Sequence, residues 1–105
     1  MSIWQWNEML PMVPREHQGT LGEGNTPMVV SRRLGPAARL PHLHFKLELT
    51  NPTGSYKDRF AASAISHMRA AGETYCVATS SGNTGAALAA YCAAASAGTV
   101  FTTAS

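Results

Sequence analysis

Short runs of apolar and β-branched residues divide most of the chain into regular segments. Each run is bounded by glycine, proline or asparagine, or by another residue typical of turns. These runs predict strands at 28–30, 44–49, 75–79 and 99–103. Residues 34–41 contain two prolines and a glycine, so we expect a loop or a short helix there.

Between these runs, apolar residues recur at helical spacing and predict a helix over residues 56–71 that ends at Gly72. The apolar face of this helix consists of Phe60, Ala64, Ile65 and Met68. The alanine-rich stretch 86–97 predicts a second helix, ended by Gly98.

Ser55 and Asp58 have the spacing of a capping box at the start of the first helix. In that motif Ser55 accepts a hydrogen bond from the Asp58 amide, and the Asp58 carboxylate reaches back to the amide of Ser55. We therefore expect the helix to begin directly after Ser55.

The order strand, helix, strand, helix, strand predicts an α/β fold, a parallel sheet with flanking helices. Residues 1–27 contain three prolines and no sustained period, so we expect an irregular N-terminal lead-in. Residues 28–105 then belong to the α/β domain.

Composition changes this picture in one respect. Only 13% of the residues are charged, and the formal net charge is +2. A small free-standing domain normally covers its large surface with charge, so much of this chain is expected to lie inside something larger.

The same features exclude several classes of function. The basic residues are scattered, which argues against a nucleic-acid partner, and no apolar run approaches the roughly 20 residues that span a membrane. Cys76 and Cys92 form no CxxC pair, which favours a reducing, cytoplasmic setting. His42 and His44 have no third ligand at a suitable spacing, so we expect no metal site.

Lys57 is the first candidate for chemistry. It follows Asn51-Pro52-Thr53-Gly54-Ser55-Tyr56 and falls in the first turn of the expected helix. The positive end of the helix dipole favours the neutral amine that reaction with a carbonyl requires. An ordinary surface lysine remains an alternative on this evidence, and Asp58 and Arg59 are interpreted as first-turn and ion-pair residues.

The second candidate is the segment Ser80-Ser81-Gly82-Asn83-Thr84-Gly85, between a strand and a helix. Its glycines allow several backbone N–H groups to point outward, and a helix N-terminus adds partial positive charge. This combination suits a carboxylate or phosphate ligand at the carboxyl end of a strand. A plain helix cap built from serine and asparagine is the alternative.

Together these segments resemble the fold-type II enzymes that depend on pyridoxal 5'-phosphate, also called tryptophan synthase beta-like, and among them the threonine synthases. The resemblance covers nearly the whole chain, with the motifs in the family's order. It rests on Trp4-Gln5-Trp6, Leu10-Pro11, Gly22-Glu23-Gly24-Asn25-Thr26-Pro27-Met28, Asn51 to Arg59, and Ser80 to Gly85.

The resemblance implies a lyase of amino-acid biosynthesis with pyridoxal phosphate as cofactor and a small amino acid as substrate. Lys57 is implied as the catalytic residue that binds the cofactor covalently, and Asn83 as the donor to the cofactor's ring oxygen. The substrate-binding residues implied are Ser80, Ser81, Gly82, Asn83 and Thr84.

The chain also departs from the family pattern. Phe60 stands where a small residue is usual, and the glycine-rich loop for the cofactor phosphate belongs further along such enzymes than Ser105. We therefore expect 28–105 to be a partial cofactor-binding domain, truncated at its C-terminus and inactive alone. A threonine or serine dehydratase and a non-catalytic remnant remain alternatives, and oligomerisation of a full-length enzyme stays open.

Overall fold

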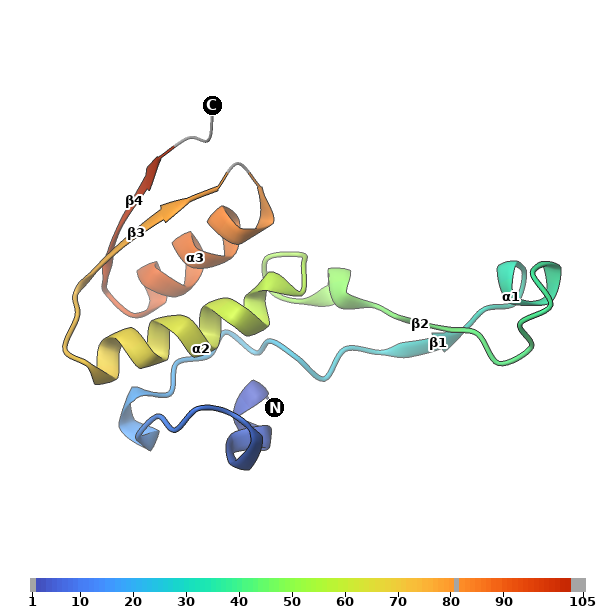
Figure 1. Cartoon of the computed structure of the whole chain (residues 1–105), viewed down its shortest axis with the longest axis horizontal. Coiled ribbons are helices and arrows are strands. Elements are labelled where there is room, and N and C mark those ends of the chain that lie inside the picture. The colour runs from blue at the N-terminus through green and yellow to red at the C-terminus, as the bar shows by residue number, and fades with distance from the viewer. Residues whose placement is uncertain (1, 81, 103–105) are drawn as a thin grey trace.

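The computed structural model describes residues 2–80 and 82–102, and most of the long elements lie in one stack of layers (Figure 1). A two-stranded sheet lies against helix α3, α3 packs on α2, and α2 rests on the N-terminal segment. The elements of this stack are β3 (Tyr75–Thr79), β4 (Gly98–Thr102), α3 (Asn83–Ala94), α2 (Lys57–Ala70) and two 3-10 helices, η1 (Ile3–Met9) and η2 (Arg15–His17).

Strands β3 and β4 are parallel, in a register that runs from Tyr75 opposite Gly98 to Thr79 opposite Thr102. Helix α3 connects them and covers one face, where Cys76 and Ala78 are half-buried. Val77 on the other face is 65% exposed. The expected α/β class and the parallel pairing of these strands are therefore observed, although residue 103 lies outside the described part.

The expectation that residues 44–49 join the parallel sheet is wrong. Strand β2 covers only His44–Lys46 and pairs antiparallel with β1 (Met28–Val30) in a separate sheet. A 3-10 helix, Glu48–Thr50, follows it, and the turn between the strands contains the short helix α1 (Leu34–Ala37). Pairing with a strand so close in sequence is a local event that needs no crossover helix.

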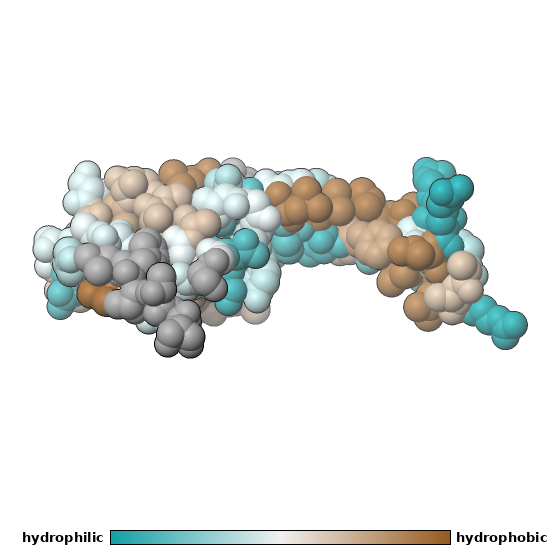
Figure 2. Space-filling model, turned by 90° about the horizontal axis from the view of Figure 1, so that it is seen from above, coloured by the Kyte–Doolittle hydropathy of each residue, from teal (hydrophilic) through white to brown (hydrophobic). Residues whose placement is uncertain are grey.

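Residues 28–46 form an arm that extends away from the layers (Figure 1). Apolar side chains lie along the surface of this arm (Figure 2). Six of them are large and exposed, namely Met28, Val29, Val30, Leu34, Leu40 and Phe45. This exposed apolar surface agrees with the low charge of the sequence.

Small side chains allow α2 and α3 to pack closely. Ala61 and Ala87 are fully buried at 0% exposure, and Ala62 is at 1%. The predicted apolar face of α2 is wrong at Phe60, which is 51% exposed. The buried face of α2 instead includes Ala61, Ala62 and Ile65, at the close contact with α3.

Both long helices were predicted, but the bounds of one of them are shifted. Helix α2 agrees with the expected range to within a residue at each end, whereas α3 begins at Asn83 and ends at Ala94, about a turn earlier than expected. The chain leaves α3 through Ser96, which has a φ of 56°, and Gly98 is already the first residue of β4. In the described residues no helix is long and apolar enough to cross a membrane.

Candidate functional site

Lys57 is the first residue of α2, and its side chain is half-buried. Its Nζ lies 5.1 Å from the centroid of the Tyr56 ring, a distance at which an ammonium is attracted to the ring face. Within the described part of the chain no carboxylate forms an ion pair with it. The Lys57 side chain is therefore partly accessible to solvent.

Asp58 holds the turn that leads into Lys57. Its Oδ2 accepts from the backbone N–H of Thr53 at 2.8 Å, and its Oδ1 accepts from the Thr53 hydroxyl. The predicted capping box is wrong: Ser55 Oγ accepts from the Lys57 amide at 3.3 Å, and the Asp58 carboxylate bonds Thr53 rather than the amide of Ser55. Because Asp58 is fully buried and shielded from water, its two oxygens need hydrogen-bond donors from the protein, and Thr53 supplies them.

The Gly-Glu-Gly segment places a second carboxylate in the interior. Gly22 and Gly24 have φ values of 91° and 87°, which residues with a side chain rarely adopt. The resulting turn buries Glu23 completely, where it accepts from Thr20, the Leu21 amide and the Ile3 amide. The Tyr91 hydroxyl of α3 donates to it at 2.9 Å.

The segment around Glu23 and the segment from Asn51 to Arg59 also form direct hydrogen bonds with each other. The Gly24 amide donates to Asn51 Oδ1 at 2.9 Å, and Arg59 Nη2 lies 3.2 Å from the Thr26 hydroxyl. Arg59 pairs with Glu48, as the ion-pair interpretation predicted, although the partner was not predicted. The hydrogen bond from Arg59 lowers the pKa of Glu48 to about 2.

Part of the loop before α3 caps the helix, and the residues that follow begin the helix itself. Ser80 Oγ accepts from the amides of Gly82 at 3.2 Å and Gly85 at 2.8 Å, so the serine part of the alternative, a helix cap, is observed, whereas Asn83 is the first residue of the helix and does not cap it. Asn83 and Thr84 are the first two residues of α3, and their N–H groups have no carbonyl of the helix to bond. Ser81 lies outside the described residues.

The two candidate segments are brought to the same end of the stack. Helices α2 and α3 start at the same side and run in the same direction (Figure 1). Tyr91 reaches Asp58 across the helix interface, and Asn83 precedes Tyr91 by eight residues. At about 1.5 Å per residue, Asn83 lies roughly 12 Å beyond Tyr91 along the axis of α3.

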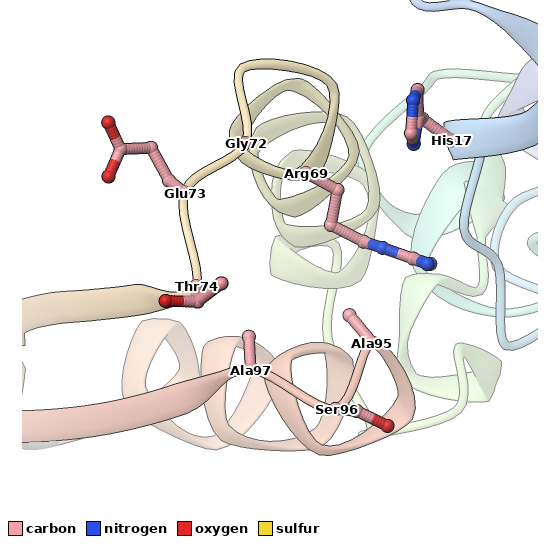
Figure 3. Close-up of a pocket in the computed structure, with 8 residues that line it drawn as sticks. All are labelled: His17, Arg69, Gly72, Glu73, Thr74, Ala95, Ser96 and Ala97. Carbon is pink, nitrogen blue, oxygen red and sulfur yellow. The ribbon is translucent and has the colours of Figure 1, made fainter.

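A small open cavity of about 190 Å³ lies at the opposite ends of these helices (Figure 3). Arg69 extends from α2 into the space between His17 and Ala95, while Glu73 points away from it. None of the predicted site residues that the structure describes lines this cavity.

Cys76 and Cys92 lie next to each other although they are 16 residues apart in the sequence. Cys92 is fully buried, and burial together with the neighbouring Cys92 raises the pKa of the Cys76 thiol, which disfavours the reactive thiolate. Within the described residues no three His, Cys, Asp or Glu side chains gather as a metal site would require.

Sequence reasoning assigned no role to Glu23, Glu48 or Tyr91. Glu23 stood in a quoted motif, and its flanking glycines were the available signal for a turn that buries a side chain. Nothing in the local sequence of Tyr91 indicates a partner that lies 68 residues away.

Comparison with known proteins identifies the class. The family model described as "Pyridoxal-phosphate dependent enzyme" matches residues 19–104, and the chain belongs to that family. Enzymes of this family and the threonine synthases among them depend on pyridoxal phosphate.

The curated relatives that match the chain include threonine synthases. The chain is 38% identical over 100 residues to threonine synthase of Halalkalibacterium halodurans, covering 87% of this chain and 27% of that protein. For Synechocystis sp. the identity is 40% over 93 residues, covering 85% and 24%. For Mycobacterium leprae it is 42% over 91 residues, covering 87% and 25%. The chain thus spans about a quarter of the length of these relatives.

Proposed function

We propose that this chain supplies the cofactor lysine and the substrate loop of a threonine synthase, which converts O-phospho-L-homoserine and water to L-threonine and phosphate. The observation that carries the proposal is that Lys57 and Asn83 are the first residues of two helices that run in the same direction and pack together. The division into a lead-in, 1–27, and part of a cofactor-binding domain, 28–105, belongs to the same proposal.

The residues present fit pyridoxal phosphate. Lys57 offers a half-buried amine with no ion pair in the described part, and Asn83 is exposed at the neighbouring helix start. When bound, the cofactor supplies an electron sink for bonds at the substrate carbons. Lys57 holds the cofactor covalently and then moves protons at those carbons, and Asn83 donates its side-chain amide to the ring oxygen.

The substrate carboxylate is assigned to the start of α3. The amides of Gly82 and Gly85 already bond Ser80, so the N–H groups of Asn83 and Thr84 and the Thr84 hydroxyl are the donors proposed for it. Ser80 orders this loop, Gly82 is the N-cap of α3, and Ser81 completes the proposed substrate-binding set. Thr84 is also proposed to lie near the substrate phosphate.

The loop assignment is tested by titrating the isotopically labelled chain with O-phospho-L-homoserine and following backbone amide resonances. We expect the amides of Asn83 and Thr84 to shift, and L-homoserine, which lacks the phosphate, to cause smaller shifts at the same positions. Shifts confined to other residues, or a stronger response to L-threonine as expected of a dehydratase, would contradict the proposal.

A further inference from the structure

Two fully buried carboxylates face one hydroxyl group. Glu23 and Asp58 are both 0% exposed, and they belong to segments 35 residues apart in the chain. The Tyr91 hydroxyl lies 2.9 Å from Glu23 Oε2 and 3.5 Å from Asp58 Oδ2. Tyr91 is itself only 3% exposed. Three separate elements, the lead-in, the start of α2 and the middle of α3, therefore meet at this group.

The hydroxyl has one proton, which it donates mainly to Glu23 at 2.9 Å and shares more weakly with Asp58 at 3.5 Å. Burial and the adjacent Glu23 carboxylate raise the pKa of Tyr91 far above its usual value, so the phenol keeps its proton. Without that proton, two carboxylates would face an oxygen of the same sign in a site shielded from water, at a large electrostatic cost.

Asp58 transmits this contact to Lys57. Both oxygens of Asp58 accept hydrogen bonds from Thr53, which closes the turn between residues 53 and 58. Lys57 lies within that turn and adjoins Asp58. A shift of the Asp58 carboxylate must therefore move the backbone that carries the Lys57 side chain.

We propose that Tyr91 is a positioning residue for Lys57: its hydroxyl ties the 53–58 turn to Glu23 and to α3, and so sets Lys57 relative to Asn83. The proposal rests on the proposed function of Lys57 as the cofactor lysine. Tyr91 touches neither cofactor nor substrate in this account and acts only through Asp58.

The test compares the two lysines of the chain. Limiting acetic anhydride is added to the 105-residue chain below its melting temperature, and acetylation at Lys57 and Lys46 is measured by peptide mass spectrometry. Lys46 is the internal reference because it lies on the arm, where its Nζ donates to the Thr26 carbonyl at 3.0 Å. Tyr91→Phe should raise the Lys57 to Lys46 ratio about threefold, because a loosened turn exposes the amine.

Tyr75→Phe is the matched control, since Tyr75 is 57% exposed and loses the same hydroxyl. Its ratio should equal that of the wild type. A lower melting temperature in Tyr91→Phe with an unchanged ratio would overturn the proposal, because that result shows a structural role alone.

A second pair of variants covers the case in which Tyr91→Phe does not fold. Thr53→Val removes the hydroxyl that bonds Asp58 and should raise the ratio, whereas Thr53→Ser keeps the hydroxyl and should restore it. Equal ratios in both would overturn the proposal. Acetylation needs no cofactor, so this outcome is separate from that of the proposed function, which fails if pyridoxal phosphate attaches elsewhere than Lys57.

Discussion

Arg59 donates two hydrogen bonds to the carboxylate of Glu48, from Nε to Oε1 at 2.6 Å and from Nη2 to Oε2 at 3.0 Å. The pair joins α2 to the 3-10 turn that follows β2. It also raises the pKa of Arg59, so both partners remain charged over the ordinary pH range. The base of the arm is thereby fastened to the helix that begins at Lys57.

This pair predicts a loss of stability in acid. The folded state lowers the pKa of Glu48 from 4.5 to about 2, so its contribution is present above pH 4.5 and is lost as pH falls through about 2. Glu48→Gln should lower the free energy of unfolding by about 1 kcal/mol at neutral pH, a figure discounted for partial exposure. Thermal melts between about pH 6 and about pH 3 should show a smaller decline in the variant than in the wild type.

Glu73→Gln is the control for that experiment, because Glu73 is exposed and has no ion pair within the described residues. Its melting profile should follow the wild type. Parallel profiles for Glu48→Gln and the wild type would contradict the role of the pair.

The α2–α3 interface predicts sensitivity to side-chain size. Ala87→Leu adds volume at a fully buried position and should destabilise the fold by about 1 to 3 kcal/mol. Ala89→Leu, on the exposed side of the same helix, should change the free energy of unfolding little. Denaturant unfolding measures both, and equal effects would place the interface elsewhere.

Local signals were sufficient for several elements. The run at 75–79 and the helix that follows Tyr56 were predicted because each is bounded by its own turn residues, and β3 has the bounds expected. The start of α3 was placed too late because Asn83, Thr84 and Gly85 indicate a turn, although such residues are tolerated at a helix N-terminus. In each case the interactions that decide the bounds of the element join residues only a few positions apart in the sequence.

Interactions between distant segments could not be predicted in this way. The antiparallel pairing of β2 with β1 depends on the partner strand, and the burial of Glu23 depends on donors from Ile3 and Tyr91. The residue types of the candidate site were identifiable from sequence, whereas the contacts that hold them in place were not. Their roles toward cofactor and substrate stay predictions.

Asn83 gives a prediction that separates orientation from covalent attachment. Asn83→Ala removes a side-chain amide and leaves Lys57 intact, so pyridoxal phosphate should still label Lys57. Turnover by an enzyme that contains this chain should fall by about tenfold or more, because the cofactor loses an orienting donor. Asn7→Ala, at another exposed asparagine, is the control, and unchanged kinetics in Asn83→Ala would count against the role.

The 105-residue chain alone should bind pyridoxal phosphate weakly. The cofactor phosphate carries nearly two negative charges and needs several N–H donors, whereas the amides of Gly82 and Gly85 already bond Ser80. The exposed apolar arm should also make the chain prone to association. Tight, saturable binding in an absorbance titration, with a cooperative melt, would refute this prediction.

The covalent attachment of the cofactor to Lys57 is the central claim, and peptide mapping tests it most directly. The chain is incubated with excess pyridoxal phosphate, reduced with borohydride and digested, and the label on Lys57 is compared with that on Lys46, the only other lysine. We predict that the label is concentrated on Lys57 and that Lys57→Ala removes it without increasing the label on Lys46. Equal labelling of both lysines, or a preference for Lys46, would contradict the account.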